Sequence, residues 1–204
     1  MVSSESTRSL VVVNAATLVV ALGLGWPVQA LLWPYWIQSV VIGYYSRRRI
    51  LALGRFSTEG FTVNDRPVSP TPAIQRSVAN FFALHYGFFH FGYLMFLIQQ
   101  SGEWRWWDLL GWLALGASFA WNHRLSFQQN VEADRHGSPN IGTLMFLPYA
   151  RVVPMHFTIL LGGTVAGSGP GAVLVFGALK TLADVLMHHI EHRVLQRQRL
   201  ALPT

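Results

Sequence analysis

The apolar residues of this chain gather into blocks of about 20 residues, the length of helix that crosses a lipid bilayer. Hydrophobic residues make up 51% of the sequence and charged residues only 12%. An ordinary soluble domain carries about 25% charged residues, so this chain has too few charges to cover a water-facing surface. The sequence therefore predicts an all-α, polytopic membrane protein and argues against a soluble enzyme.

Six helical spans can be placed along the chain, forming one transmembrane domain over residues 1–204. The predicted spans cover residues 9–25, 30–50, 77–98, 106–127, 141–165 and 171–194. Segment 51–76 is polar and contains Pro67, Pro70 and Pro72, which predicts a loop. The first block could instead be a signal peptide, but no clear small-x-small cleavage site follows it.

Arginines and tryptophans orient these spans. Arginines from Arg47 to Arg76 surround the connection of spans two and three, and others follow spans four and six. Because positive charge favours the cytoplasmic side, both termini are predicted to be cytoplasmic, in a bacterial inner membrane. Tryptophans gather mostly near the opposite ends. The net charge of +6 does not predict nucleic-acid binding, because the basic residues flank apolar blocks.

Several ionisable residues fall inside the predicted spans, where each costs roughly 2.5 to 3.5 kcal/mol on insertion scales and therefore tends to face the bundle interior. They are His85, His90, His123 at the end of span four, Arg151, His156, Lys180, Asp184, His188, His189, Glu191 and His192. Lys180, Asp184 and His188 recur every four residues, which places them on one stripe of a helix. Lys180 is also the only lysine of the chain.

Charge and helix geometry predict how some of these residues interact. Arg151 is the expected counter-ion of Asp184, because neither charge is stable alone in hydrocarbon. His85 and His90 are five residues apart, about 140° around a helix, so they cannot both point at one site. One is predicted to be a ligand and the other a hydrogen-bond partner.

The first functional hypothesis is an intramembrane metalloprotein, with zinc as the favoured metal. The predicted ligands are His85, His90, His156, Asp184, His188 and His192. Three imidazoles can hold Zn²⁺ with an open position and activate a bound water. Asp184 would orient a ligand or act as a base, and Arg151 or Lys180 would stabilise an oxyanion. Such a site suits a hydrolase acting on a lipid-like or small hydrophobic substrate.

Other cofactors and functions remain open. Haem b between two histidines, or copper bound by imidazoles, is compatible with the same residues, whereas the absence of cysteine excludes thiolate sites. A line of ionisable groups from His90 and Lys180 through Asp184 to His192 also resembles a pathway for protons or divalent cations. This predicts a transporter as the alternative, with a structural role as a third. A homo-oligomer is compatible with any of them.

Four phrases carry a family resemblance: LLWPYWIQSVVIGYY, FFALHYGFFH, PYARVVPMHFTILLGG and KTLADVLMHHIEHR. They resemble a family of uncharacterised bacterial integral membrane proteins, classed as a domain of unknown function, with His-Tyr-Gly, Pro-Tyr-x-Arg and Lys-x3-Asp-x3-His in this order. The resemblance implies a shared constellation of His85, Tyr86, Gly87, Arg151, His156, Lys180, Asp184 and His188. The family pattern has a glutamate-asparagine pair where this chain has Gln38 and Ser39. That difference argues against a role that needs a carboxylate from the second span.

Overall fold

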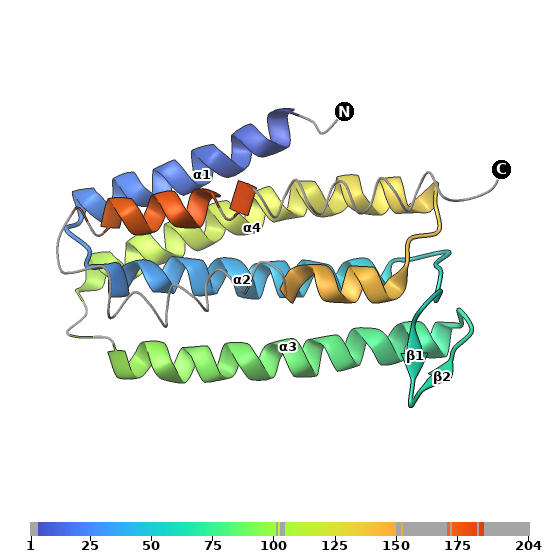
Figure 1. Ribbon diagram of the computed structural model, residues 1–204. Coiled ribbons are helices and arrows are strands. Elements are labelled where there is room, and N and C mark those ends of the chain that lie inside the picture. Colours follow the sequence, from blue (N-terminus) through green and yellow to red (C-terminus); the bar gives the residue numbers. More distant parts are fainter. Residues whose placement is uncertain are drawn as a thin grey trace.

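The computed structural model describes residues 4–100, 102, 105–149, 152, 171, 173–182, 184 and 185. Their main elements are α1 (Ser4–Gly23), α2 (Val28–Leu51), α3 (Pro72–Gln100) and α4 (Trp106–Arg135). Residues 141–149 and Val173–Leu182 are also helical. The long helices run roughly along one direction and lie side by side (Figure 1). The prediction of an all-α fold is confirmed for this part of the chain.

Helix α2 is the centre of the packing. It contacts α3 and α4, while α1 contacts α4 and α2. Gly25 ends the first helix with a φ of +64°, a conformation that side chains with a Cβ rarely adopt. The backbone N–H of Trp26 then donates to the carbonyl of Ala21 at 2.8 Å, and Pro27 leads into α2. This short connection folds α2 back beside α1.

Large side chains from α2, α3 and α4 fill the space between these helices. Tyr35, Phe82 and Phe119 are almost fully buried. The rings of Trp33 and Trp112 stack with their centroids 5.1 Å apart, joining α2 to α4. Stacked aromatic pairs contribute about 0.5–1.5 kcal/mol beyond their buried area, so these contacts help set the helix spacing.

The polar segment between α2 and α3 contains a small β-hairpin of β1 (Thr62–Val63) and β2 (Arg66–Pro67). Its turn residues, Asn64 and Asp65, have φ values of 49° and 60°, as two-residue hairpin turns require. Ser57 also pairs with Asn140 through an isolated parallel bridge, which attaches this segment to the chain after α4. The hairpin is too short to produce an alternating sequence pattern, so the sequence predicts only a loop.

Three helices extend at least five residues beyond the predicted spans. Helix α1 begins at Ser4 rather than residue 9, α3 begins at Pro72 rather than residue 77, and α4 continues to Arg135 rather than residue 127. Hydropathy marks only the apolar part of a helix, whereas polar residues such as Gln128, Gln129 and Glu132 continue α4 without interrupting it. The fifth and sixth predicted spans are described only in part.

Among the described helices, α3 alone is long and apolar enough to cross a membrane, over Pro72–Gln99 with a mean hydropathy of 1.5. Two shorter apolar helices are Val11–Gly23 and Val173–Leu182. Helix length and composition in the described part therefore indicate one candidate span rather than the six expected from the sequence. Polar residues lower the mean hydropathy of α2 and α4, the apolar part of α1 is short, and the fifth and sixth predicted spans lie only partly within the described residues.

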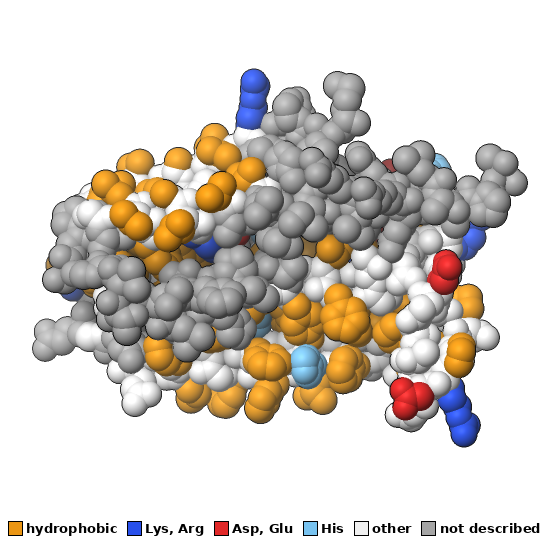
Figure 2. Space-filling view, in the orientation of Figure 1, with side chains coloured by type: hydrophobic (Ala, Val, Ile, Leu, Met, Phe, Trp, Pro, Cys, Tyr) orange, Lys and Arg blue, Asp and Glu red, His pale blue; other side chains and the backbone are white. Residues whose placement is uncertain are grey.

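Apolar and polar side chains are distributed in an unusual way between surface and interior. Leu84 and Phe88 of α3 are 77% and 71% exposed, and Val19 of α1 is 70% exposed. Figure 2 shows apolar side chains along the length of the molecule, with carboxylates and arginines near the hairpin. Among the residues that the structure describes, the buried polar ones are Asn14, Thr17, Gln38, Ser39, Arg49, His90, Asp108, Asp134, Lys180 and Asp184. Charged side chains are almost never fully buried unless they are paired, so the buried charged residues are the first place to look for a functional site.

Candidate functional site: a buried lysine and aspartate centre

Lys180 and Asp184 form an ion pair inside the bundle. The Lys180 Nζ atom lies 2.5 Å from Asp184 Oδ2, and each residue is 7% exposed. The two residues are four positions apart, so consecutive turns of one helix present both groups on the same face. The sequence predicts this shared face, and the structure brings the two charges into contact.

Helices α1 and α2 contribute hydrogen-bond partners to the pair. Asn14 of α1 donates from Nδ2 to Asp184 Oδ2 at 3.0 Å, and Lys180 donates to Gln38 Oε1 of α2 at 3.4 Å. A buried ion pair is stable only when hydrogen bonds satisfy its remaining polar atoms. Side chains from three separate segments therefore converge on one charged centre, which we call the Lys180–Asp184 centre.

Tyr35 forms one wall of the Lys180–Asp184 centre. The Lys180 Nζ atom lies 4.7 Å from the centroid of the Tyr35 ring, a cation–π contact, and the Phe176 ring lies 5.6 Å from that of Tyr35. The Tyr35 hydroxyl and Asn14 Oδ1 are buried and have no hydrogen-bond partner among the described residues. Buried polar atoms are usually satisfied, so these two atoms are available to a water molecule or a small polar ligand.

Lys180 is an ionic partner of Asp184 that the sequence analysis does not assign. The sequence predicts Arg151 as the counter-ion of Asp184, and the structure shows an ion pair between Asp184 and Lys180. Lys180 lies one helical turn away, so it reaches the carboxylate without another span. Arg151 lies outside the described residues.

The two histidines of α3 point in different directions. His85 is exposed, and its Nδ1 lies 2.8 Å from the Tyr149 hydroxyl. His90 is only 4% exposed: its Nδ1 lies 2.8 Å from the Tyr86 carbonyl, and its ring stacks on that of Tyr86 at 4.1 Å. A carbonyl oxygen can only accept a hydrogen bond, so the Nδ1 atom of His90 must carry the hydrogen and donate it. The geometry gives His90 a packing role against Tyr86.

The metal hypothesis receives no support from the described residues. No three of their histidine, aspartate and glutamate side chains lie close enough together to share a metal ion. His85, His90 and Asp184 therefore do not form a metal site by themselves. The other predicted ligands, His156, His188 and His192, lie outside the described part of the chain, together with His189 and Glu191.

A second ion pair, which the sequence does not predict, joins α2 to α4 near the hairpin end. Arg49 donates from Nε and Nη2 to the two carboxylate oxygens of Asp134 at 2.7 and 2.9 Å, and both residues are buried. Such bidentate pairs are among the stronger charge-assisted hydrogen bonds. The residues are 85 positions apart, and Asp134 falls in a predicted loop, so no local signal identifies the pair.

At the opposite end, a third ion pair lies within the tryptophan-rich region. Arg105 donates to Asp108 at 2.9–3.0 Å through its side chain, and Trp26 donates from Nε1 to Asp108 at 2.6 Å. Arg105 also donates to the Leu24 carbonyl at 2.9 Å. These bonds connect the start of α4 to the turn between α1 and α2. Ion pairs thus occur near both ends of the bundle as well as at the Lys180–Asp184 centre.

The fold and the centre together define a class: an all-helical protein that exposes apolar side chains and buries charged ones. Residues 2–201 match the family described as "Family of unknown function (DUF6498)", and the chain belongs to this family. The resemblance to an uncharacterised family is thereby confirmed. No curated protein and no solved structure matches the chain.

Proposed function

We propose that this chain is a multi-pass protein of the bacterial inner membrane. The main support is the contrast between the exposed Leu84 and Phe88 and the buried Lys180–Asp184 pair. Lipid tails favour an apolar exterior, and charged groups in the hydrocarbon region usually face the bundle interior. In this proposal the six predicted spans cross the membrane, with both termini and the arginine-rich hairpin end in the cytoplasm.

We infer that the Lys180–Asp184 centre serves proton-linked transport. A proton bound by Asp184 removes its negative charge and weakens its attraction to Lys180, so proton binding is coupled to the contacts among α1, α2 and the helix of Lys180. The ion pairs Arg49–Asp134 and Arg105–Asp108 lie near the two ends of the bundle, so they could close the path between the centre and each side of the membrane. The cargo is expected to be small, because only water-sized or slightly larger groups fit between packed helices.

The proton-binding step can be measured by pH-induced infrared difference spectroscopy of the reconstituted full chain. We expect a carbonyl band from a protonated carboxyl group that disappears in Asp184→Asn and shifts in Lys180→Met. Asp108→Asn is the matched control, because it removes another buried carboxylate and should leave that band unchanged. A spectrum that is the same in wild type and Asp184→Asn would contradict a proton-exchanging Asp184.

Transport itself requires protons to cross the membrane. Proteoliposomes loaded with a pH-sensitive dye should lose an imposed pH gradient faster than protein-free vesicles when divalent cations are supplied as trial cargo. Asp184→Asn should lower the protein-dependent rate at least about tenfold, the effect of losing one essential proton-transfer group. An equal rate with and without wild-type protein would exclude proton-linked transport of these cations.

A zinc-dependent hydrolase acting on a lipid-like substrate is the second proposal. One observation favours it: Asp184 is buried, and the sequence places His188 one helical turn after it. Protein purified without chelator should then contain stoichiometric zinc, and His156→Ala and His188→Ala should each remove it with little loss of fold. Visible absorbance would indicate haem b or copper instead. Metal-free protein that is not stabilised by added metal would exclude the metal hypothesis.

A further inference from the structure

A pocket between α2 and α4, near the hairpin end, is separate from the Lys180–Asp184 centre. Arg49 lies 11 residues after Gln38, about 16 Å along α2. The pocket encloses about 70 Å³, enough for a small ionic group and not for a large ligand. Its polar lining consists of Tyr45, Ser46, Arg49, His123, Ser126 and Asn130.

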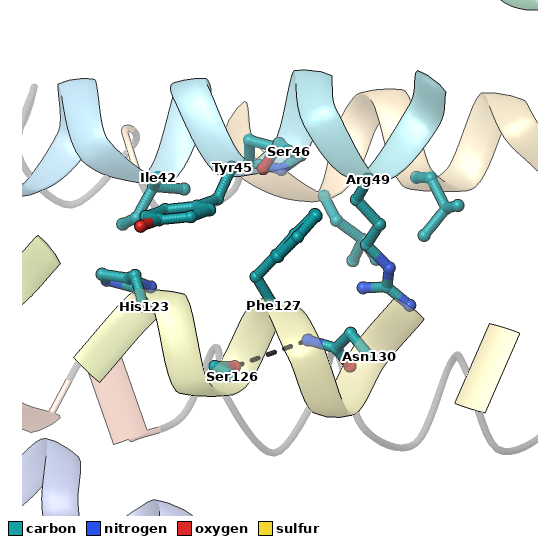
Figure 3. A pocket seen from close by; sticks show the side chains of 11 residues that line it. Ile42, Tyr45, Ser46, Arg49, His123, Ser126, Phe127 and Asn130 are labelled. Atoms are coloured by element: carbon teal, nitrogen blue, oxygen red, sulfur yellow. Dashed lines mark hydrogen bonds between the residues drawn. The ribbon is translucent and has the colours of Figure 1, made fainter. Parts of the chain in front are cut away.

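These residues face one another across the gap between the two helices. Figure 3 shows Tyr45 and Arg49 reaching from α2 toward α4, with Phe127 between them and Ser126 and Asn130 on the opposite wall. Asn130 donates to Ser126 Oγ at 3.4 Å. Arg49 uses Nε and Nη2 to bind Asp134, while Nη1 makes no hydrogen bond to the described residues. The Arg49 guanidinium is therefore fixed by Asp134 through Nε and Nη2, and its Nη1 atom can donate to a ligand.

The charge of the lining selects the kind of ligand. Among the described residues that line the pocket there is no aspartate or glutamate. The carboxylate of Asp134 forms an ion pair with Arg49. Arg48 adds positive charge beside the pocket, with its guanidinium carbon 5.2 Å from the centroid of the Phe127 ring. A cationic ligand would be repelled by Arg48 and would meet no carboxylate in the described lining. Arginine together with hydroxyl and amide groups is instead the donor set that recognises phosphate oxygens.

We propose that this pocket binds a phosphate group through Arg49, Tyr45, Ser46 and Ser126. The group could belong to a phospholipid head group or to free inorganic phosphate, since both present the same oxygens. Apolar walls from Ile42, Leu144 and Leu147 would contact the first carbons of the acyl chains of a lipid. The site lies at the arginine-rich end of the bundle, where lipid head groups would lie in the membrane orientation proposed above.

The test uses the full-length protein in a neutral detergent, with three probes. Inorganic phosphate is compared with chloride at equal ionic strength by thermal shift, and phosphatidylglycerol is compared with diacylglycerol, which has no phosphate, by native mass spectrometry. Saturable binding of phosphate alone assigns the site to a soluble anion. Saturable binding of phosphatidylglycerol alone assigns it to lipid head groups, and binding of both supports a general phosphate site.

Two variants connect binding to this pocket. Ser126→Leu fills the cavity and keeps the Arg49–Asp134 pair, whereas Arg49→Gln with Asp134→Asn removes the guanidinium without leaving a buried charge. Each should weaken binding at least about tenfold, the value of one charge-assisted hydrogen bond. Arg105→Gln with Asp108→Asn, at the other end, should leave binding unchanged. Wild-type protein that binds neither phosphate nor phosphatidylglycerol, or equal binding by Ser126→Leu, would overturn the proposal.

Discussion

At the residue scale, Lys180 and Asp184 depend on each other. Their side chains are both buried, and Asn14 and Gln38 form hydrogen bonds with them. A buried pair contributes little net stability compared with apolar residues, but removing one member leaves an uncompensated charge. The Gln38 amide cannot replace Lys180, because it carries no charge to neutralise Asp184.

Lys180→Met should therefore lower the free energy of unfolding by about 3–5 kcal/mol, because it removes the buried positive charge that pairs with Asp184. The double variant Lys180→Met with Asp184→Leu should recover most of this loss. The measurement is reversible unfolding of the purified protein in mixed micelles. Leu179→Met, at a neighbouring exposed position, serves as control. Equal destabilisation by the single and double variants would disprove the ionic coupling.

At the element scale, the contact between α2 and α3 depends on a missing side chain. A Cβ atom added at Gly43 would lie 2.5 Å from the Tyr86 ring, whereas one added at Gly92 meets nothing within 4 Å. Tyr86 is itself held by a 3.0 Å hydrogen bond from its hydroxyl to the Ser39 carbonyl. Gly43 therefore lets α2 and α3 approach closely, a requirement that the amino-acid pattern of neither helix reveals.

Gly43→Ala should destabilise the protein by about 1–3 kcal/mol, because the added methyl group forces the Tyr86 ring or the helices to move. Gly92→Ala is the matched control, and it should be neutral or stabilise by up to about 1 kcal/mol through helix propensity. Unfolding midpoints of the two variants test the difference. If both substitutions shift stability in the same direction by the same amount, the close contact is not important.

At the scale of the whole molecule, the proposed membrane orientation places the two ends of the bundle on opposite sides of the bilayer. Arginines gather around the hairpin between α2 and α3, and the tryptophan-rich turn next to Gly25 lies at the other end. The chain contains no cysteine, so thiol labelling of a single introduced cysteine measures the accessibility of that position alone.

Ser69→Cys, in the loop near the hairpin, should resist a membrane-impermeant maleimide in intact cells and react after the inner membrane is opened. Gly102→Cys, at the tryptophan end, should react once the reagent reaches the periplasm. The expected difference follows from the cytoplasmic placement of arginine-rich connections. Wild-type protein is the unlabelled control. Labelling of both positions from the same side would contradict the six-span orientation.

The all-helical fold and the common face of Lys180 and Asp184 were predictable from the sequence, because both depend on spacing within one helix. The outer limits of α3 and α4 were not, because polar residues can continue a helix beyond its apolar part. The hairpin at Thr62–Val63 and Arg66–Pro67 was also missed, since two-residue strands contain too few positions for an alternating pattern.

The sequence by itself determined that this chain forms helices, exposes few charges and carries an unusual lysine and aspartate on one helical stripe. Only the tertiary structure decided that Asn14 reaches Asp184 across 170 residues and that Arg49 pairs with Asp134 across 85. The physical reason is that local spacing sets the face on which a side chain lies. The partner it meets depends on which helices pack together and on how closely residues such as Gly43 allow them to approach.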